Sequence, residues 1–452
     1  MKNFEQPVPL DQQWYDTFEK HAAFQAYEYL DGDKEYREEQ KKKFLAGEIE
    51  NPELDYPKID IDKLNEREQM LLKLRKDIKA LEQNEVISQV YRWRLNEKIA
   101  ELRIAKATAN HDMRRFQGYS EFVYGTPSPD VFAYTIQNIR KTAEKALESE
   151  NEEIKQTAQE LLAALPNNLP KVKMQELPEA KTRQLAKELT LKEMGDLVNI
   201  SYKAGELVAE DIKEMFTQAL ANLRVEGWSV VIDKSSKTGI SVDQEIKTIK
   251  VPESRKMLFD KLRTLIAHEI GTHVTRRVKG ERSKLKLLGL GLDRYEKGEE
   301  GVATMREQAL SNELKDYAGL DGHLAIGLAM GLDGKPRDFR QVYEILEKYY
   351  RLNNLLQGKK KEEALAASQT SAWNRSVRTF RGTDCKTPGV CFTKDIIYRE
   401  GNIETWAVVK NKPEEMSRFS IGKYDPANPR HIWILNMLGI TDKELEQPQE
   451  TA

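Results

Sequence analysis

Cysteine is scarce in this chain of 452 residues, which contains only Cys385 and Cys391. Two cysteines are too few for a disulfide framework, and their spacing matches no zinc-binding pair. No histidine lies near them in the sequence. We therefore expect two reduced thiols, as in a cytoplasmic protein.

Long apolar segments are also missing. The longest run, Leu324–Leu332, is far shorter than the about 20 residues that a membrane-spanning helix needs. Residues 1–15 carry acidic side chains and no apolar core, which argues against a signal peptide. These absences predict a protein of the cytoplasm with no membrane partner.

The chain has no excess of either charge. Charged residues make up 32% of the sequence, but the formal net charge is only −2. Such a balance gives no overall attraction to nucleic acid or to an anionic membrane surface, so we expect neither as a partner. The apolar content of 39% is enough for a large core.

Histidine is rare as well, yet two of the six histidines stand close together. His268 and His273 flank Glu269 within Leu262–Lys279, whose apolar residues recur at helical spacing. Neutral imidazoles are good zinc ligands, and a carboxylate beside them can take a proton from a metal-bound water. The alternative is an ordinary amphipathic helix that carries two histidines.

The spacing of these histidines predicts a distorted turn. Five residues of regular helix rotate by about 500°, which leaves the two imidazoles roughly 140° apart and unable to bind one ion. One inserted residue, accommodated as a π-type turn, returns them to about the same face. Gly271 lies between them and tolerates such a distortion. We expect a π-bulge or local unwinding between His268 and His273.

The rest of the chain reads as mostly helical with one small sheet. Two short helices are expected in residues 11–47, and further helical segments in 62–111, 130–165 and 175–221. Later helices are expected from about Glu299 and near 323–330, 338–356 and 361–380. Three segments alternate or are rich in β-branched residues and predict a small antiparallel sheet, at 228–233, 239–242 and 246–251. This order of elements is an α+β fold.

Two boundaries of the histidine helix and one further strand are expected. Pro252 should end the sheet and open the helix that carries the histidines, and Gly280 should stop that helix. A last strand is expected at Cys391–Tyr398.

The break at Gly125–Pro129 divides the chain into an accessory helical region, 1–125, and a region that contains the histidine motif, 126–452. Residues 62–111 form a long charged helix or a helical hairpin. This segment is either an arm that presents a surface to a protein partner or a helical layer packed on the core.

A second motif follows the histidine helix. A zinc site with two imidazoles needs a third protein ligand and one open position for water. The adjacent carboxylates of Glu299 and Glu300, in the glycine-bounded segment Lys297–Ala303, supply candidates. Two acidic residues at a helix start can equally be favourable first-turn charges.

Together, His268-Glu-Ile-Gly-Thr-His273 and Glu299-Glu-Gly-Val-Ala303 resemble the family of the microtubule-associated tyrosine carboxypeptidase. Members of that family are zinc metallopeptidases with a His-Glu-x-x-x-His motif and a downstream Glu-Gly-Leu-Ala motif. Val302 stands where leucine is usual, and Lys279 where asparagine is expected. The resemblance covers roughly residues 115–410, with supporting blocks at Arg276, Gly280, 323–329, 378–382, 392–395 and Tyr398.

The resemblance implies a zincin-like metallopeptidase that holds one Zn²⁺ ion on His268, His273 and Glu300. Glu300 is preferred to Glu299 because it directly precedes a glycine, as the ligand does in the family motif. Glu269 is then the general base, and Glu299 would orient a ligand histidine. The implied substrate is the C-terminus of a peptide or protein, with tyrosine or phenylalanine as the residue removed.

Peptide hydrolysis also needs a donor for the developing oxyanion. Tyr398, Lys394 and His323 are candidates that the sequence does not rank. His323 lies in an apolar segment that contains glycine, so it can equally be a structural histidine that supports the core.

Recognition of a free C-terminal carboxylate suits arginine, whose planar fork matches that group. Arg375, Arg378 and Arg381 recur at intervals of three and lie near one helical face, with Lys394 expected on the following strand. The resemblance favours Arg378 and Arg381 as the carboxylate receptor. The alternative is a solvated basic helix end.

The sequence therefore predicts a zinc carboxypeptidase of the cytoplasm. Two other functions stay open. One is a zinc endopeptidase, and the other is a regulatory or scaffold protein that uses the 62–111 segment and holds a structural zinc. A structural zinc site is usually closed by four protein ligands.

Overall fold

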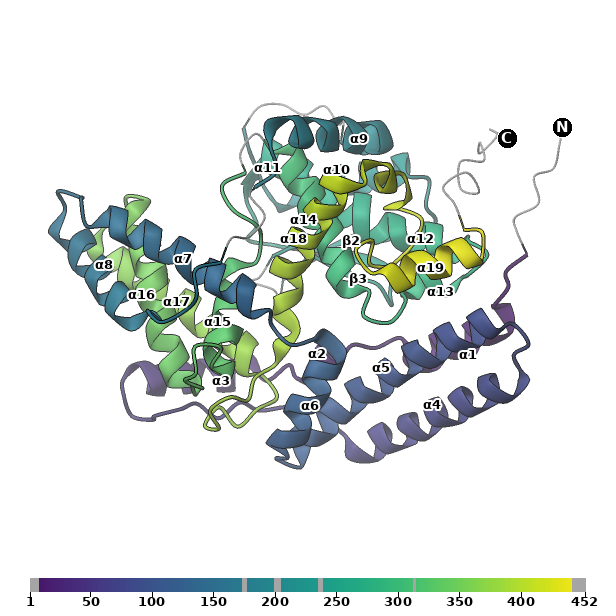
Figure 1. Ribbon diagram of the computed structural model, residues 1–452, viewed down its shortest axis with the longest axis horizontal. Helices are drawn as coiled ribbons and strands as arrows, with labels where there is room; N and C mark the ends of the chain where they lie inside the picture. Colours follow the sequence, from purple (N-terminus) through teal and green to yellow (C-terminus); the bar gives the residue numbers. More distant parts are fainter. Residues whose placement is uncertain (1–7, 173–176, 199–204, 235–238, 312–313, 441–452) are drawn as a thin grey trace.

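Helices make up most of the computed structural model, which describes residues 8–172, 177–198, 205–234, 239–311 and 314–440. Small sheets accompany them, so the predicted α+β class is confirmed. Figure 1 shows a helical lobe on the left, a helical hairpin along the lower edge and the sheet at the upper right. Among the described residues, no helix is long and apolar enough to cross a membrane.

The first six helices precede the break at Gly125. They are α1 (Gln12–Ala22), α2 (Ala26–Tyr29), α3 (Lys34–Leu45), α4 (Ile61–Leu81), α5 (Glu85–Ala109) and α6 (Met113–Tyr124). Residues 11–47 therefore hold three helices where two were expected. Asn84 ends the turn between α4 and α5 and caps α5, because its Oδ1 accepts hydrogen bonds from the backbone N–H groups of Val86 and Ile87, at 3.0 and 3.2 Å.

The α4–α5 hairpin packs on the rest of the chain. Leu71 and Ile78 of α4 are fully buried in one hydrophobic cluster with residues of α1, α5 and the segment Leu285–Leu292. Arg94 of α5 donates a hydrogen bond to the carbonyl of Leu290 at 3.4 Å. The hairpin is thus a packed layer rather than a free arm, and a partner for its outer surface stays a prediction.

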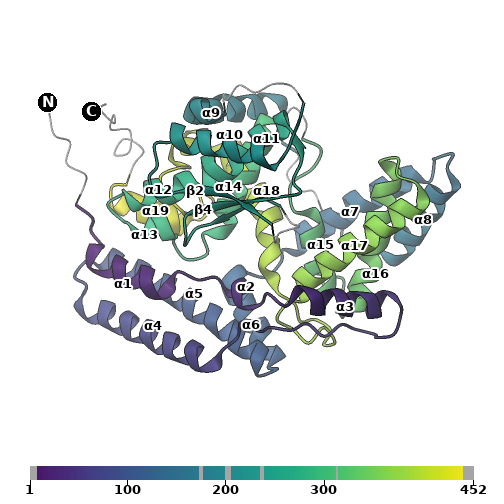
Figure 2. The ribbon, with the colours of Figure 1, turned by 180° about the vertical axis from the view of Figure 1, so that it is seen from behind.

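A lobe of five helices forms the left side of Figure 1, namely α7 (Pro129–Ala146), α8 (Glu152–Ala164), α15 (Leu320–Met330), α16 (Phe339–Leu356) and α17 (Lys361–Phe380). Figure 2 shows α3 lying against this lobe. The ring centroid of Phe44 on α3 is 5.3 Å from that of Phe339 and 5.5 Å from that of Trp373. Packing therefore crosses the expected boundary at residue 125, and the division into two domains stays a prediction.

Two small sheets precede the histidine helix. β1 (Glu206–Leu207) pairs antiparallel with β5 (Met257–Leu258), and the second sheet has the order β2 (Ser229–Asp233), β4 (Thr248–Pro252), β3 (Ser241–Asp243). β3 and β4 are antiparallel, but β2 and β4 are parallel. The prediction of an antiparallel sheet is therefore wrong for the β2–β4 pair.

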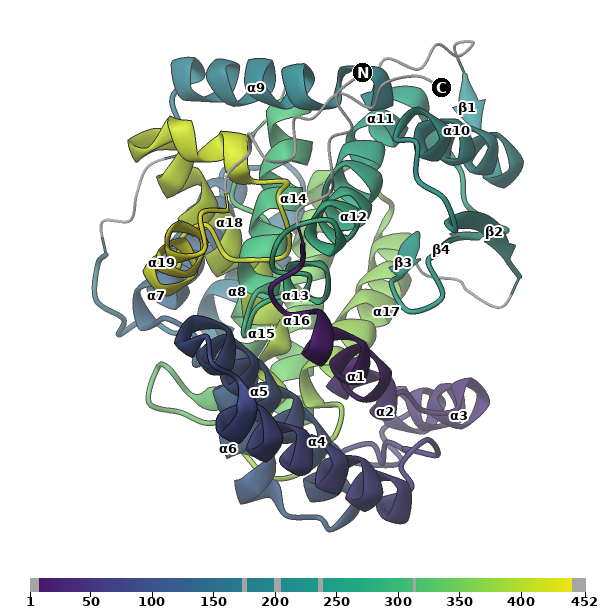
Figure 3. The ribbon, with the colours of Figure 1, turned by 90° about the vertical axis from the view of Figure 1, so that its right-hand side faces the viewer.

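The order of the strands explains this difference. A meander would keep β3 between its neighbours in sequence and make both pairs antiparallel. Instead β4 takes the centre, where Ile249 and Val251 are fully buried. Alternation along the sequence identifies strands but does not fix which of them is central. α10 (Ala209–Asn222) packs on this sheet, as Figure 3 shows.

The helix that carries the two histidines, called the histidine helix below, has three parts: α11 (Phe259–His268), η1 (Glu269–Val274) and α12 (Thr275–Glu281). It does not open at Pro252, because β5 intervenes. It also does not stop at Gly280. A Cβ on Gly280 would lie 2.4 Å from the carbonyl carbon of Leu288, so this glycine allows α12 to approach α13 (Leu287–Leu290) closely.

α14 (Glu296–Leu310) packs against the histidine helix and against α18 (Ile396–Asn411). The remaining elements are α9 (Ala180–Val198), η2 (Thr393–Asp395), η3 (Pro413–Arg418) and α19 (Pro429–Met437). The strand expected at Cys391–Tyr398 is wrong, because the 3₁₀ turn η2 leads directly into α18. Ile396 and Ile397 are buried against the helices of the lobe, and this packing overrides their preference for strands.

Candidate metal centre

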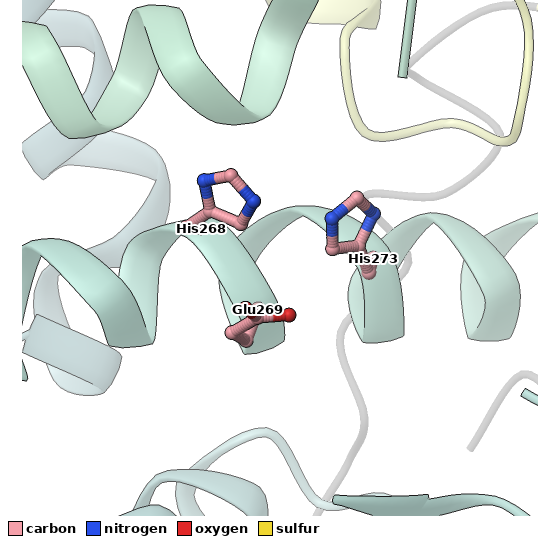
Figure 4. Close-up of side chains that lie close together, drawn as sticks. All are labelled: His268, Glu269 and His273. Carbon is pink, nitrogen blue, oxygen red and sulfur yellow. The ribbon is translucent and has the colours of Figure 1, made fainter. Parts of the chain in front are cut away.

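The predicted distortion of the histidine helix is confirmed. η1 is a π-helical turn between His268 and Thr275. It brings the two imidazoles to the same side of the helix, as Figure 4 shows. The ring centroids of His268 and His273 are 5.1 Å apart, with an angle of 69° between the ring planes.

Side-chain hydrogen bonds support this widened turn. The hydroxyl of Thr272 donates to the carbonyl of Ala267 at 3.0 Å, five residues earlier in the chain. Arg306 of α14 donates to the carbonyl of Gly271 at 2.9 Å and pairs with Glu193 of α9 at 2.5 Å. The turn is therefore held from two other helices.

The donor atoms of the motif converge. Ligand atoms of His268, Glu269 and His273 all lie within 4.8 Å of one another, and within the described part of the chain no other group of three such side chains does so. Glu300 comes from α14, and its Oε2 lies 3.9 Å from Nε2 of His268. Two imidazoles with nearby carboxylates form a donor set that suits a divalent ion such as zinc.

Glu299 fixes the orientation of His273. Its Oε1 lies 2.9 Å from Nδ1 of that imidazole, which leaves Nε2 available to a metal. Glu299 is itself held by Arg276 at 3.0 Å and by Lys423 at 3.5 Å. Burial alone would raise the pKa of Glu299, but Lys423, Arg276 and His273 lower it to about 2. The carboxylate therefore stays ionised, in the place that the resemblance implied for it.

Glu307 has the matching position at His268, and the sequence analysis missed it. Its Oε2 lies 3.3 Å from Nδ1 of His268, on the far side of the ring from Glu300. Burial lowers the pKa of His268, yet Glu307, Glu269 and Glu300 outweigh that effect and raise it to about 9. This excess of negative charge around one imidazole matches a site built for a cation.

Glu269 is buried beside both imidazoles. Burial raises its pKa, His268 and His273 lower it, and the carboxylates of Glu300 and Glu307 raise it further, with a net increase. A carboxylate with a raised pKa is a better proton acceptor than an exposed one. The position and the environment of Glu269 both suit a general base.

Sequence comparison gives the family. The model for the family described as microtubule-associated tyrosine carboxypeptidase matches residues 169–444, more than half of the chain. The chain belongs to this family. No curated protein matches it. Membership of the microtubule-associated tyrosine carboxypeptidase family implies a peptidase of the carboxypeptidase type, and the matched range contains all the candidate site residues from His268 to Tyr398.

Within the part shared with this carboxypeptidase family, Tyr398 lies next to the candidate metal centre. The charge of Glu300 is the largest cause of its raised pKa, followed by burial and the charge of Asp395, so the phenol stays protonated at neutral pH. The role of Tyr398 as a donor to the oxyanion stays a prediction.

Lys394 and His323 contact residues other than the candidate metal ligands. The ammonium of Lys394 pairs with Glu296 and lies 5.0 Å from the ring centre of Tyr27. His323 is fully buried, and its Nε2 lies 3.0 Å from Glu400. Neither contact involves a candidate metal ligand. The role of these two side chains as donors to the oxyanion stays a prediction.

Two of the three arginines bind one carboxylate, that of Asp395. Arg378 donates two hydrogen bonds to Asp395, at 2.8 and 2.9 Å, and Arg375 donates a third at 2.6 Å. Burial would raise the pKa of Asp395, but Arg378 and Arg375 lower it to about 2. The guanidinium of Arg381 lies 4.9 Å from the ring centre of Phe392, and its buried Nε has no hydrogen-bond partner within the described residues.

Proposed function

We propose that this protein is a zinc-dependent carboxypeptidase that removes a C-terminal tyrosine or phenylalanine from a peptide or protein. The observation that carries the proposal is the π-turn, which aligns His268 and His273 beside Glu269. Family membership supports the carboxypeptidase class.

His268, His273 and Glu300 would hold the zinc ion. Their fit is supported by the excess of carboxylates around His268 and by the contact that turns Nε2 of His273 outward from Glu299. When bound, the ion supplies a Lewis acid for the peptide carbonyl and lowers the pKa of a water molecule to about 7.

Glu269 accepts the proton of the attacking water and then passes it to the nitrogen of the leaving residue. Its buried position beside the imidazoles keeps bulk water away from this proton. Tyr398 stays protonated and donates a hydrogen bond to the negative charge that develops on the carbonyl oxygen when the water attacks the carbonyl carbon.

Arg378 and Arg381 recognise the free carboxylate at the end of the substrate. The side chain of Arg378 is 45% exposed although it pairs with Asp395, so one face of its guanidinium remains open. The unpartnered Nε of Arg381 offers a further donor. Together they would select substrates with a free C-terminus.

The test uses peptides that differ only in the last residue, assayed with and without a chelator. We expect release of tyrosine or phenylalanine that stops with the chelator, and a loss of at least about a hundredfold in the Glu269→Gln variant with zinc still bound. Cleavage of a peptide with an amidated C-terminus would instead indicate an endopeptidase. Bound zinc without any cleavage would indicate the scaffold role.

A further inference from the structure

A cavity is lined by residues other than the candidate metal ligands and Glu269. It has a volume of about 790 Å³, and its walls come from the end of α6, the start of α14, one face of α18 and the segment Asp425–Ile432. None of His268, Glu269, His273 and Glu300 lines it. Cavities of this size hold small organic ligands or single side chains.

Three carboxylates of this cavity share one lysine. Lys297 pairs with Glu404 at 2.7 Å, and Asp425 and Glu400 also act on its charge. Within the described residues, neither Glu400 nor Asp425 has a lysine or arginine nitrogen within 4 Å. Glu400 contacts the imidazole of His323 and accepts from the backbone N–H of Ser128 at 2.7 Å, and Asp425 accepts from the backbone N–H of Ala427 at 2.9 Å. The cavity therefore holds negative charge that the protein does not compensate.

The arginine that lines the cavity does not supply the missing charge. Arg294 is exposed, and its guanidinium lies 5.0 Å from the ring centre of Phe122. Lys412 is exposed as well. Both cations are exposed to solvent, so Lys297, paired with Glu404, is the lysine nearest to the carboxylates among the described residues that line the cavity.

Tyr124 gives an independent sign of a ligand. This residue lines the cavity and is only 8% exposed, yet its hydroxyl has no hydrogen-bond partner among the described residues. A buried hydroxyl without a partner is costly, so such groups are usually satisfied. Near it the wall is apolar, with Val123, Ile397 and Val408.

We propose that this cavity binds a primary alkylammonium group, which is carried either by a lysine side chain of another protein or by a free aliphatic diamine. The ammonium donates to Asp425, Glu404 and Glu400, and its carbon chain lies along the apolar wall near Tyr124. A compact ammonium with three donors suits a wall that carries several carboxylates better than the planar fork of a guanidinium, which pairs with a single carboxylate. This site is independent of the proposed peptidase function.

The test is isothermal titration calorimetry of the full-length protein with two probes, diaminopentane and an acetylated, amidated Gly-Lys-Gly tripeptide. The amidated peptide is not a carboxypeptidase substrate, so a failure here is distinct from a failure of the proposed function. We expect saturable binding of at least one probe. The probe that binds shows whether the source is a protein lysine or a free amine. The analogue with norleucine in place of lysine should not bind.

Variants locate the site. The double variant Glu404→Gln with Asp425→Asn should weaken binding at least about tenfold. Tyr124→Phe keeps the ring and should weaken it about threefold or more. Glu414→Gln changes an exposed glutamate outside the cavity and should leave the affinity unchanged. Thermal melts followed by circular dichroism confirm that each variant is folded.

Three results would overturn the proposal. The first is that neither probe binds at millimolar concentration. The second is that the tripeptide with norleucine or arginine in place of lysine binds as tightly as the lysine tripeptide. The third is that the affinity is unchanged in both the double variant and Tyr124→Phe.

Discussion

Glu307 and Glu300 stand on opposite sides of one imidazole, since Glu307 contacts Nδ1 of His268 at 3.3 Å and Glu300 approaches Nε2 at 3.9 Å. A carboxylate at Nδ1 fixes the tautomer that presents Nε2 to a metal. Both glutamates come from α14, two turns apart, so this helix supplies the carboxylate nearest Nδ1 of His268 and also the candidate third ligand.

The first prediction follows from this arrangement. Glu307→Gln should raise the zinc dissociation constant about tenfold to a hundredfold, because the ring of His268 loses its charged anchor. Competition with a chromophoric chelator measures the change. Lys261→Met removes the outer partner of Glu307 without touching the imidazole and serves as the control. Equal zinc affinity in Glu307→Gln and the unaltered protein would contradict the role of this carboxylate.

A second prediction concerns Tyr398. If its hydroxyl donates to the oxyanion, Tyr398→Phe should lower kcat about a hundredfold and change KM little, because the contact is made mainly in the transition state. Steady-state kinetics on a peptide that ends in tyrosine separates the two constants. A change confined to KM would place the hydroxyl against the ground-state substrate instead.

The third prediction tests the carboxylate receptor. Arg378→Gln should raise KM for a peptide with a free C-terminus about tenfold or more, since it removes a charged donor from the substrate carboxylate. Arg115→Gln changes an arginine whose side chain is 74% exposed and should have no effect. A KM for Arg378→Gln that matches this control would assign Arg378 to holding Asp395 only.

Asp395 gives a prediction about acid stability. The pKa of Asp395 is about 2 in the folded protein, and its ordinary value, which applies to the unfolded chain, is 3.8. The ion pairs with Arg375 and Arg378 therefore stabilise the fold above pH 4. This stabilisation is lost as the pH falls from 3.8 to about 2. The shift corresponds to about 2 kcal/mol of the free energy of unfolding at neutral pH.

Urea unfolding of the unaltered protein and of Asp395→Asn at several pH values measures this contribution. The difference in the free energy of unfolding between them should be largest at pH 7 and should shrink below pH 4. A difference that is constant with pH would mean that the carboxylate acts through packing and not through its charge.

The geometry of the histidine helix could be predicted from the sequence because it follows from counting. The step of five residues from His268 to His273 exceeds one helical turn, and only an inserted residue returns the imidazoles to one face. The contact of Glu299 with His273 came from the family resemblance. The contribution of Glu307 could also have been predicted, because this residue follows Glu300 by two turns on the same helix face.

Other features depend on packing that the sequence pattern does not contain. The run from Cys391 to Tyr398 has the composition of a strand, but the lobe that buries Ile396 and Ile397 accepts a helix there. Gly280 has the position of a helix stop, and only the approach of Leu288 explains why glycine is needed. The central place of β4 likewise depends on which strand becomes most buried.

The π-turn also has a consequence for the length of this segment. A widened turn absorbs its extra residue in one place, so the residues after it keep the faces that they would have in a regular helix. A helix with its histidines four residues apart and this helix, which has one residue more between them, therefore present two imidazoles in the same way. Such a helix can gain a residue between its imidazoles while the side chains of α12, including Arg276 beneath Glu299, stay in register.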